Sequence, residues 1–438
     1  MAYIDRYEYY LEHVSADMER YRRSGKWMVF GYTSNYDVII RWDVRVFNRI
    51  AAEYLTGEPS FKEGEVINSV EDFVRVVSFC AIHGLGGEID IVNSRVCDFI
   101  ESVFATGSAL GGTGAQGAAA LGAMGFPLIL HITDRSKEVC EKLNYPGLVM
   151  VSGDTLIPVM EGARDTAPVR HLIMQYSKDD VLELRGARYT IPLSNRLIMD
   201  YDTVHKSFLV DREFLGYLES HADSLVSYSV SGFNAFLDSE VLRRRLEELR
   251  IHYGRIKAAS RCTLYLEGAH YLNPKIRHLT FGMLAESVDI LGMNGEELAD
   301  LTKDLGQGAD GDSLESVLAG LELILETYSV RGVVMHTGDY SLYYGAEPDC
   351  GDMEKGLTLG NIMSATRART GSYGTRSDCE KTLSVPLSPA GVSFARELES
   401  VDRKRYACLV PSRYMENPKY TIGLGDTFVA GMQIGFIC

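Results

Sequence analysis

Near its C-terminal end the sequence reads Tyr420-Thr421-Ile422-Gly423-Leu424-Gly425-Asp426-Thr427-Phe428. A Gly-x-Gly turn leads into an acidic residue, and the small, apolar run 428–431 that follows predicts the start of a buried helix. Free backbone amides at the N-terminus of a helix attract anions. A carboxylate at Asp426 could therefore accept a proton from an alcohol while the amides hold a phosphoryl group. The alternative is a helix-capping Asp after a glycine turn, and the nine residues alone leave it open.

The composition indicates a globular protein of more than one domain. The chain has 438 residues, of which 46% are hydrophobic, and its formal net charge is −16. This length exceeds the roughly 100–200 residues of a typical domain. The negative charge argues against nucleic acid or an anionic membrane surface as the main partner, so small molecules are the expected partners. An anionic substrate would then need a local positive site.

Targeting and redox features favour a cytoplasmic location. Residues 1–6 are charged and aromatic, which predicts no signal peptide. No apolar run approaches the roughly 18 residues that span a bilayer. The eight cysteines form no C-x-x-C pair, so neither a zinc site nor a disulfide framework is expected. Reduced thiols of a cytosolic protein are the simplest interpretation.

Short apolar runs alternate with helical patterns over most of the chain. The expected strands are 27–32, 127–132, 148–151, 224–230, 262–267, 287–291 and 332–336, and the expected helices include 238–257, 274–285 and 313–328. This alternation predicts an α/β fold with a doubly wound, mainly parallel sheet flanked by helices. Residues 180–203 alternate in polarity, which predicts a hairpin of a separate, smaller sheet. The glycine- and polar-rich region 337–375 predicts a long functional loop or an insertion.

Polar residues and glycines occupy positions where ligands bind in such folds. Asn35 and Asp37 follow the first strand, and ligands gather at the carboxyl ends of parallel strands. A loop Asx-turn is the alternative for this pair. The run 107–120 contains Gly111, Gly112 and mostly small side chains, so a helix N-terminus could come very close to a ligand there. Tight packing of a helix on a sheet explains the same run.

Three later strands end in residues that suit a metal or nucleotide site. Glu267, Asn294 and His336 each stand at the exit of one of these strands, and Glu297 lies three residues after Asn294 at a predicted helix start. Mg²⁺ takes oxygen ligands and keeps several waters, so one or two carboxylates plus phosphate suffice to bind it. The alternatives are an ordinary capping box for Asn294 and Glu297 and a hydrogen-bonded strand-end histidine.

Several of these segments match, in order along the chain, the signatures of one enzyme family. They are Asn417-Pro418-Lys419-Tyr420-Thr421-Ile422-Gly423-Leu424-Gly425-Asp426-Thr427 (N-P-x-x-T-x-G-L-G-D-T), Ser194-Asn195-Arg196-Leu197-Ile198 (N-R-F-I), Asn294-x-x-Glu297 (N-x-x-E), Leu266-Glu267 (H-x-E), Val334-Met335-His336-Thr337 (V-x-H-T), Gly111-Gly112, and Gly31–Asp37 (N-x-D). On these residues the sequence resembles the ADP-dependent sugar kinases, the glucokinase and 6-phosphofructokinase group of the ribokinase-like fold. The matches run from residue 30 to residue 431 and cover nearly the whole chain.

The resemblance implies a role for each matching residue. Asp426 would be the base that deprotonates the sugar hydroxyl, with the amides of Gly423 and Gly425 as the anion hole. Arg196 would reach the phosphates of ADP, a bidentate task that suits arginine, and His336 and Gly425 would also lie at the nucleotide. Mg²⁺ would be organised by Glu267, Asn294, Glu297 and Asp426. The sugar would be held by Asn35, Asp37, Glu88, Gly111 and Gly112.

The resemblance also implies the reaction and the domain organisation. A large nucleotide-binding domain would comprise 1–39, 111–179 and 204–438, and a small β-rich lid would comprise 40–110 and 180–203. The β-phosphoryl group of MgADP would pass to a hydroxyl of fructose 6-phosphate or glucose, giving AMP and a sugar phosphate in glycolysis. Lid closure would complete the site and exclude water. The protein would be a monomer or a small homo-oligomer.

The acceptor and two rival functions stay open. A phosphorylated acceptor needs cations beside it, and the lid segment is rich in them, namely Lys178, Arg185, Arg188 and Lys206. Glu88 could instead hydrogen-bond a neutral hexose. The sequence departs from the family pattern at Tyr265, which stands in place of the histidine of H-x-E, and at Asn234, where some relatives have histidine. The rivals are an ATP-dependent carbohydrate kinase of the same fold and a catalytically inactive sugar-binding regulatory protein.

Overall fold

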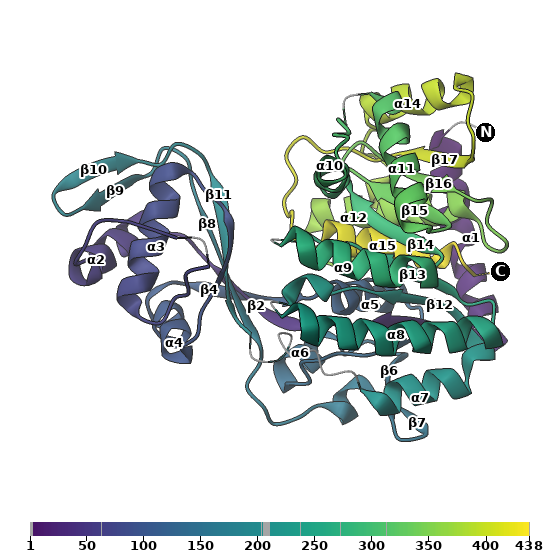
Figure 1. Cartoon of the computed structure of the whole chain (residues 1–438), viewed down its shortest axis with the longest axis horizontal. Coiled ribbons are helices and arrows are strands. Elements are labelled where there is room, and N and C mark those ends of the chain that lie inside the picture. Colours follow the sequence, from purple (N-terminus) through teal and green to yellow (C-terminus); the bar gives the residue numbers. More distant parts are fainter. Residues whose placement is uncertain are drawn as a thin grey trace.

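A ten-stranded sheet forms the centre of the larger part of the molecule (Figure 1). The computed structural model describes residues 3–62, 64–202, 204, 211–236, 238–271, 273–311 and 313–437. The strand order is β17 (Tyr406–Pro411), β16 (Tyr340–Gly345), β15 (Gly332–His336), β14 (Ile290–Asn294), β13 (Thr263–Glu267), β12 (Leu225–Val230), β1 (Trp27–Gly31), β5 (Leu128–Leu130), β6 (Leu148–Ser152) and β7 (Thr155–Pro158). The strands from β15 to β6 are parallel, whereas β16 and the two edge strands β17 and β7 pair antiparallel with their neighbours.

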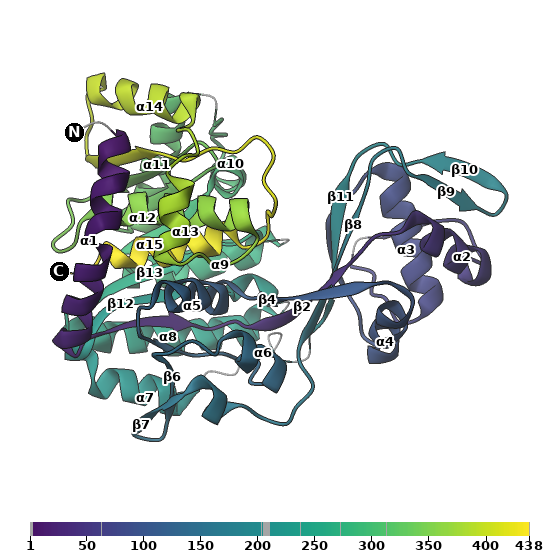
Figure 2. The same ribbon diagram turned by 180° about the vertical axis from the view of Figure 1, so that it is seen from behind.

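Helices cover both faces of this sheet, and each face has its own hydrophobic core. One layer, in front in Figure 1, contains α7 (Arg212–Ser220), α8 (Ser239–Ala259), α9 (Pro274–Leu284), α10 (Gly295–Asp304), α11 (Leu314–Tyr328) and α14 (Pro389–Ser400). The other layer, in front in Figure 2, contains α1 (Tyr3–Ser24), α5 (Thr113–Met124), α6 (Lys137–Lys142), α12 (Met353–Thr370), α13 (Arg376–Thr382) and α15 (Leu424–Ile434). The strands between the layers read as continuous apolar runs because both of their faces are buried.

A smaller body projects from one end of the larger one (Figure 2). Its five-stranded sheet has the order β3 (Gly87–Asp90), β11 (Asn195–Tyr201), β8 (Arg170–Tyr176), β2 (Asn35–Ile40) and β4 (Thr106–Gly111). The hairpin of β9 (Val181–Leu184) and β10 (Ala187–Thr190) and the helices α2 (Val44–Tyr54), α3 (Val70–His83) and α4 (Ser94–Val103) complete it. A third, separate core lies between this sheet and its helices.

The second sheet takes in more of the chain than the expected lid segments. Strands β2 and β8 belong to it, although residues 35–39 and 170–176 were assigned to the larger domain. Position 203, at the expected end of the lid segment, lies outside the described residues. The smaller body is called the lid below, and it comprises the five-stranded sheet, the β9–β10 hairpin and helices α2–α4.

The alternation of strands and helices predicts the parallel part of the sheet correctly but fails over residues 337–375. That region is not one long loop, because it contains β16 and the 18-residue helix α12. Helix α12 is buried nearly all round, so its sequence of Gly, Thr, Ser, Ala and Leu has no polar face to mark a helical period.

Cysteines and hydropathy agree in part with expectation. Six cysteines in the described ranges are free thiols, whereas Cys350 is disulfide-bonded, which the expectation of reduced thiols did not include. None of the helices in the described ranges combines the length and the apolarity that a membrane span requires.

Candidate active site

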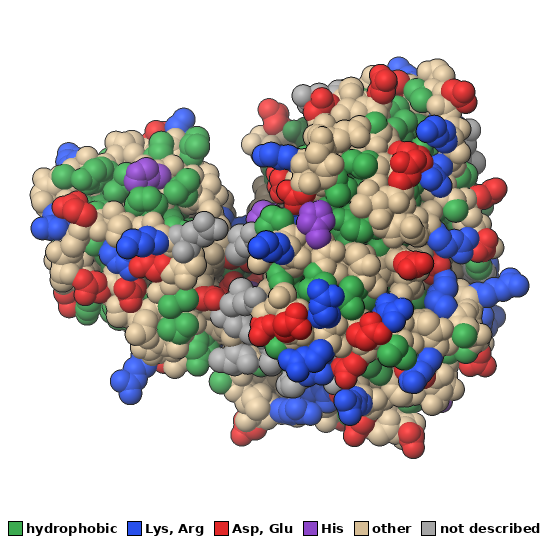
Figure 3. Space-filling view, viewed as in Figure 1, with side chains coloured by type: hydrophobic (Ala, Val, Ile, Leu, Met, Phe, Trp, Pro, Cys, Tyr) green, Lys and Arg blue, Asp and Glu red, His purple; other side chains and the backbone are tan. Residues whose placement is uncertain are grey.

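A cleft of about 590 Å³ separates the lid from the carboxyl ends of the large sheet (Figure 3). Eight of the residues singled out from the sequence line it, namely Asn35, Asp37, Glu88, Gly111, Gly112, Arg196, Gly423 and Asp426. They come from β2, β3, the β4–α5 junction, β11 and the start of α15. The fold therefore brings together, from both bodies, residues that are up to almost 400 positions apart in sequence.

The sugar-side residues meet where β2 and β4 cross from the large body into the lid. Asn35 pairs with Gly111 in the register of these antiparallel strands, and Asn35 Nδ2 donates to Asp37 Oδ1 at 2.6 Å. A side chain at Gly111 would overlap both Asn35 and Asp37, so only glycine lets the three groups meet. Asp37 is 4% exposed, and burial raises the pKa of its carboxyl to about 7.

Asp426 lies in the first turn of α15, at the base of the cleft. The residue before the helix, Gly423, has φ of +69°, a conformation that glycine adopts without strain and that lets the turn lead directly into the helix. Burial and the neighbouring Glu267 raise the pKa of Asp426, while hydrogen bonding from Thr113 opposes that rise. The carboxyl group thus faces the cleft at the positive end of a helix, as the sequence pattern predicts.

Two residues next to Asp426 were not identified from the sequence. Gln116 of α5 donates from Nε2 to Asp426 Oδ2 at 2.7 Å. Arg367 of α12 donates to Gln116 Oε1 at 2.9 Å. Gln116 is the only amide in a run of small, apolar residues, which was a usable signal, whereas Arg367 falls in the region expected to be a loop.

The strand-end residues cluster at the same edge of the sheet but behind the cleft. Glu267 Oε2 accepts from the Tyr265 hydroxyl at 2.9 Å, and His336 Nε2 lies 2.9 Å from Glu267 Oε1. The carboxylate can only accept, so His336 donates through Nε2. Burial lowers the pKa of His336, but the bond to Glu267 outweighs it and the net shift is upward. Tyr265 stands where the family signature has histidine. Its uncharged hydroxyl is the donor of the hydrogen bond that positions Glu267.

Asn294 and Glu297 form a capping box at the start of α10. Asn294 Oδ1 accepts from the Glu297 amide at 2.9 Å, and Glu297 Oε2 accepts from the Asn294 amide at 2.9 Å. Burial, with the nearby Glu267, raises the pKa of Glu297 to about 7. The capping alternative is thus present, and it leaves one Glu297 oxygen for another partner.

The oxygen atoms of these strand-end residues suit one kind of metal ion. Among the described residues, no three His, Cys, Asp or Glu side chains converge as a preformed metal centre. Two carboxylates, Glu267 and Glu297, lie close enough for the charge of Glu267 to raise the pKa of Glu297. A pair of oxygen donors that needs a cation fits Mg²⁺, which keeps several waters and is completed by phosphate, better than a metal that requires a full protein cage.

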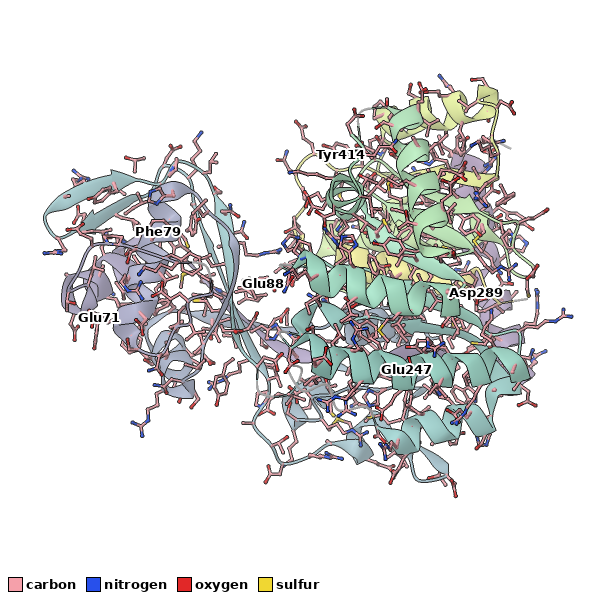
Figure 4. The ribbon with its side chains drawn as sticks, viewed as in Figure 1. Glu71, Phe79, Glu88, Glu247, Asp289 and Tyr414 are labelled. Carbon is pink, nitrogen blue, oxygen red and sulfur yellow. The ribbon has the colours of Figure 1, made fainter. Side chains whose placement is uncertain are left out.

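The lid side of the cleft is acidic. Carboxylates line it from β2, β3, β11 and the residue after Tyr201, namely Asp37, Glu88, Asp90, Asp200 and Asp202. Figure 4 shows Glu88 on the side of the lid that faces the large body. Burial and the charge of Asp200 raise the pKa of Glu88 to about 7. The cations among the described residues that line the cleft are Arg196 and His171, and the sequence did not point to His171.

His171 lies within this acidic group. Its Nδ1 is 3.3 Å from Asp200 and its Nε2 is 3.9 Å from Asp202. Burial alone would lower the pKa of His171, but these carboxylates raise it to about 9. The histidine is therefore an imidazolium at neutral pH, and its charge is matched by the aspartates around it.

Of the four cations expected near a phosphorylated acceptor, the three that the structure describes do not line the cleft. Arg185 and Arg188 belong to the β9–β10 hairpin, where they pair with Glu58 at 3.3 Å and Glu183 at 3.8 Å. Lys178 is exposed in the turn before β9, and Lys206 lies outside the described residues. Ordinary surface charge accounts for the three that are described.

Comparisons with known proteins agree with the motifs. A family model described as "ADP-specific Phosphofructokinase/Glucokinase conserved region" matches residues 26–434. The chain belongs to this family. Membership confirms the resemblance and the predicted reaction class, an ADP-dependent phosphotransferase that acts on fructose 6-phosphate or glucose.

Relatives of the chain include both a phosphofructokinase and a glucose kinase. ADP-specific phosphofructokinase of Pyrococcus furiosus is 22% identical, over 93% of this chain and 96% of the relative. ADP-dependent glucose/glucosamine kinase of Pyrococcus abyssi is 23% identical, over 82% of each chain. A solved ADP-dependent kinase in complex with fructose-6-phosphate and ADPβS superposes with a TM-score of 0.77 at 18% identity, over 100% of this chain and 98% of that chain. This superposition confirms the α/β fold.

Proposed function

We propose that this chain is an ADP-dependent kinase whose acceptor is a neutral hexose, with glucose as the reference substrate. One observation supports the reaction above all: Asp426 lies at the base of the cleft, in the first turn of α15, beside the amides of the Gly423–Gly425 turn. A base and an anion site thus adjoin each other. The cytoplasmic location and the state as monomer or small homo-oligomer stay predictions.

The acidic lid wall supports the uncharged acceptor. A phosphorylated sugar would place roughly two negative charges next to the carboxylates of β2, β3 and β11. The electrostatic free energy that this costs grows as water leaves the closing cleft. The described cations at the cleft are Arg196 and an already paired His171. Arg196 is needed for the donor phosphates. Hydroxyl groups, in contrast, can donate hydrogen bonds to Glu88 and Asp37.

The proposed mechanism is an in-line transfer. Asp426 accepts the proton of the attacking sugar hydroxyl while the oxygen of that hydroxyl forms a bond to the β-phosphorus of ADP. The bond between that phosphorus and the bridging oxygen breaks, its electron pair stays on that oxygen, and AMP leaves. Amides at the N-terminus of α15 stabilise the charge on the transferring group, and Arg196 holds the donor phosphates from the lid.

Magnesium is part of the proposal. Glu267 and Glu297 would hold Mg²⁺ through one or both carboxylates and water, with Asn294 orienting Glu297 through the capping box. When bound, Mg²⁺ supplies neutralisation of the phosphate charge. His336 keeps Glu267 in place and lies at the N-terminus of α15, close to where the nucleotide would bind.

Fructose 6-phosphate is the second candidate acceptor, because the P. furiosus relative, at 22% identity, is a phosphofructokinase. Formation of the sugar phosphate is measured with ADP or ATP as donor and with glucose or fructose 6-phosphate as acceptor, since the nucleotide product is AMP from ADP but ADP from ATP. We expect ADP with glucose to give the highest kcat/KM. A preference for fructose 6-phosphate would overturn the argument from the acidic wall, and a preference for ATP would overturn the donor.

Asp426→Asn tests the mechanism in the same assay. We expect kcat to fall by about 10²–10⁴-fold, because the amide cannot act as a base. Asp154→Asn, in the exposed turn between β6 and β7, is the matched control and should keep the wild-type kcat. Wild-type turnover by Asp426→Asn would rule out its role as base, and sugar binding without turnover in the unmodified protein would favour a regulatory protein.

A further inference from the structure

Two buried residues outside the predicted site connect Asp426 to the helix layer behind it. Gln116 is 4% exposed and Arg367 is 3% exposed. The Gln116 amide lies between them, with Nε2 donating to Asp426 Oδ2 at 2.7 Å and Oε1 accepting from Arg367 Nη2 at 2.9 Å. The Tyr373 hydroxyl also donates to Gln116 Oε1, at 3.2 Å.

The orientation of this amide is set by Arg367. A guanidinium group has only donors, so it requires the amide oxygen on its side. The NH₂ group of Gln116 must then point to Asp426, whose ionised carboxylate is only an acceptor. With the amide turned over, NH₂ would face the guanidinium and the oxygen would face the carboxylate, so both contacts would be repulsive. Arg367 thus determines which group the base carboxylate meets.

Arg367 is itself held rigidly. Its Nε donates to the Ile422 carbonyl at 2.9 Å, and its guanidinium lies 4.0 Å from the ring centre of Tyr373 and 5.0 Å from that of Tyr420. A planar guanidinium can satisfy the carbonyl and the glutamine at once, which lysine cannot do. Ile422 precedes Gly423, where any side chain would overlap Gln116 Oε1. One arginine therefore anchors both the turn and the glutamine.

We propose that Gln116 and Arg367 are positioning residues for phosphoryl transfer: Arg367 fixes the Gln116 amide, and the amide holds the Asp426 carboxylate in the orientation that accepts the hydroxyl proton. The proposal rests on the proposed function, because it takes Asp426 to be the base. Correct orientation of a reacting group contributes directly to rate, and a charge-assisted hydrogen bond is strong enough to supply it.

The same contacts stabilise the ionised form of the base. Asp426 is surrounded by charged or titratable groups from several elements, namely Asp37 of β2, Glu267 of β13, Glu297 of α10, His336 of β15, Arg367 of α12 and Tyr373 of the loop after α12. The carboxylates among them favour the protonated acid, so the N–H of Gln116 and the charge of Arg367 act against them. Removal of either raises the pKa of Asp426 and moves the acid limb of the kcat profile to higher pH.

The test is the dependence of kcat and KM on pH, from pH 5 to 9, for Gln116→Leu, Arg367→Met and the double variant. We expect each single variant to lower kcat by about 10–100-fold, the scale of one hydrogen bond to a charged group, with KM for the sugar nearly unchanged. The acid limb should rise by about one pH unit. Because the two residues act as one unit, the kcat of the double variant should lie within about threefold of the kcat of the slower single variant.

Gln433→Leu is the matched control. It removes a different buried side-chain amide, which belongs to α15 and whose polar atoms have no partner in the described structure. It should leave kcat and the acid limb unchanged. Gln116→Glu, nearly the same in shape, covers the case that Gln116→Leu does not fold, and it should move the acid limb upward by placing a second carboxyl beside Asp426. An unchanged kcat and acid limb in folded Gln116→Leu or Gln116→Glu, or multiplicative losses in the double variant, would overturn the proposal. If Asp426→Asn is active, the proposed function fails instead.

Discussion

At the scale of single residues, burial of carboxylates near one another sets the chemistry of the cleft. Asp37 and Glu88 come from different strands, and burial raises the pKa of each to about 7. A carboxyl group that is close to half protonated can both donate to and accept from a sugar hydroxyl. Burial of these two groups therefore costs stability in the free protein, although Asn35 already donates a hydrogen bond to Asp37 there.

Glu88→Gln tests that cost. The carboxyl binds protons more tightly in the folded than in the unfolded chain, so wild-type stability falls as pH rises from about 4.5 to about 7 and then levels off. The amide removes this penalty. We expect the variant to gain roughly 1–2 kcal/mol in free energy of unfolding at pH 8 and almost nothing near pH 4, measured by urea denaturation without ligand. KM for glucose should rise.

Glu58→Gln, at an exposed ion pair of the lid, is the control for that experiment. Its effect should stay below about 0.5 kcal/mol at both pH values. A gain for Glu88→Gln that is equal at pH 4 and pH 8 would show that ionisation of Glu88 is not its cause.

At the scale of elements, the close pairing of α12 and α15 positions Asp426, the proposed base. The two helices touch through glycines: a Cβ at Gly431 of α15 would lie 2.5 Å from the backbone nitrogen of Gly360 in α12. Arg367 follows Gly360 by about two turns of the same helix. Separation of these helices would therefore move Arg367 away from Gln116 and Asp426.

Gly431→Ala tests this pairing. The added methyl meets backbone, which cannot move aside as a side chain can, so we expect a loss of about 1–3 kcal/mol in unfolding free energy and a lower kcat. Gly254→Ala is the matched control, because Gly254 is in the exposed interior of α8 with nothing within 4 Å. That variant should be neutral or gain up to about 1 kcal/mol. Equal effects of both changes would contradict the packing argument.

At the scale of the whole molecule, two bodies with separate cores face each other across the cleft. Residues that should act on one reaction are divided between them, with Arg196 and Glu88 on the lid and Asp426 on the large body. Since the lid has its own core, it can move as a unit without loss of packing in the large sheet.

Small-angle scattering tests closure of the lid. We expect the radius of gyration to fall by on the order of 1 Å when glucose and a non-reactive ADP analogue are both saturating. Arg196→Ala should reduce the response to the nucleotide, because it removes the lid residue that holds the phosphates. Identical scattering curves with and without ligands would show that the cleft does not close.

Local patterns in the sequence were sufficient to predict much of the fold and part of the candidate site. The apolar runs of β13, β14 and β15 predicted parallel strands, because burial on both faces demands continuous hydrophobic residues. The carboxyl ends of such strands share one edge, so Glu267, Asn294 and His336 could be expected to lie together, as they do. The Gly423–Asp426 segment predicted a carboxylate at a helix N-terminus, because a Gly-x-Gly turn leads directly into a small, apolar run that is typical of a buried helix.

The contacts around Asp426 and the acidic wall of the cleft depend on the tertiary structure alone. Gln116 and Asp426 are 310 residues apart, and no local pattern records that they touch or that Arg367 orients the amide between them. The acidic wall around His171 arises because β2, β3, β8 and β11 pair in the lid, although their segments are scattered from residue 35 to residue 201. Periodicity reports which face of an element is buried, whereas charge and hydrogen bonding depend on which elements meet. The sequence therefore predicted the proposed base, and the fold determined what surrounds it.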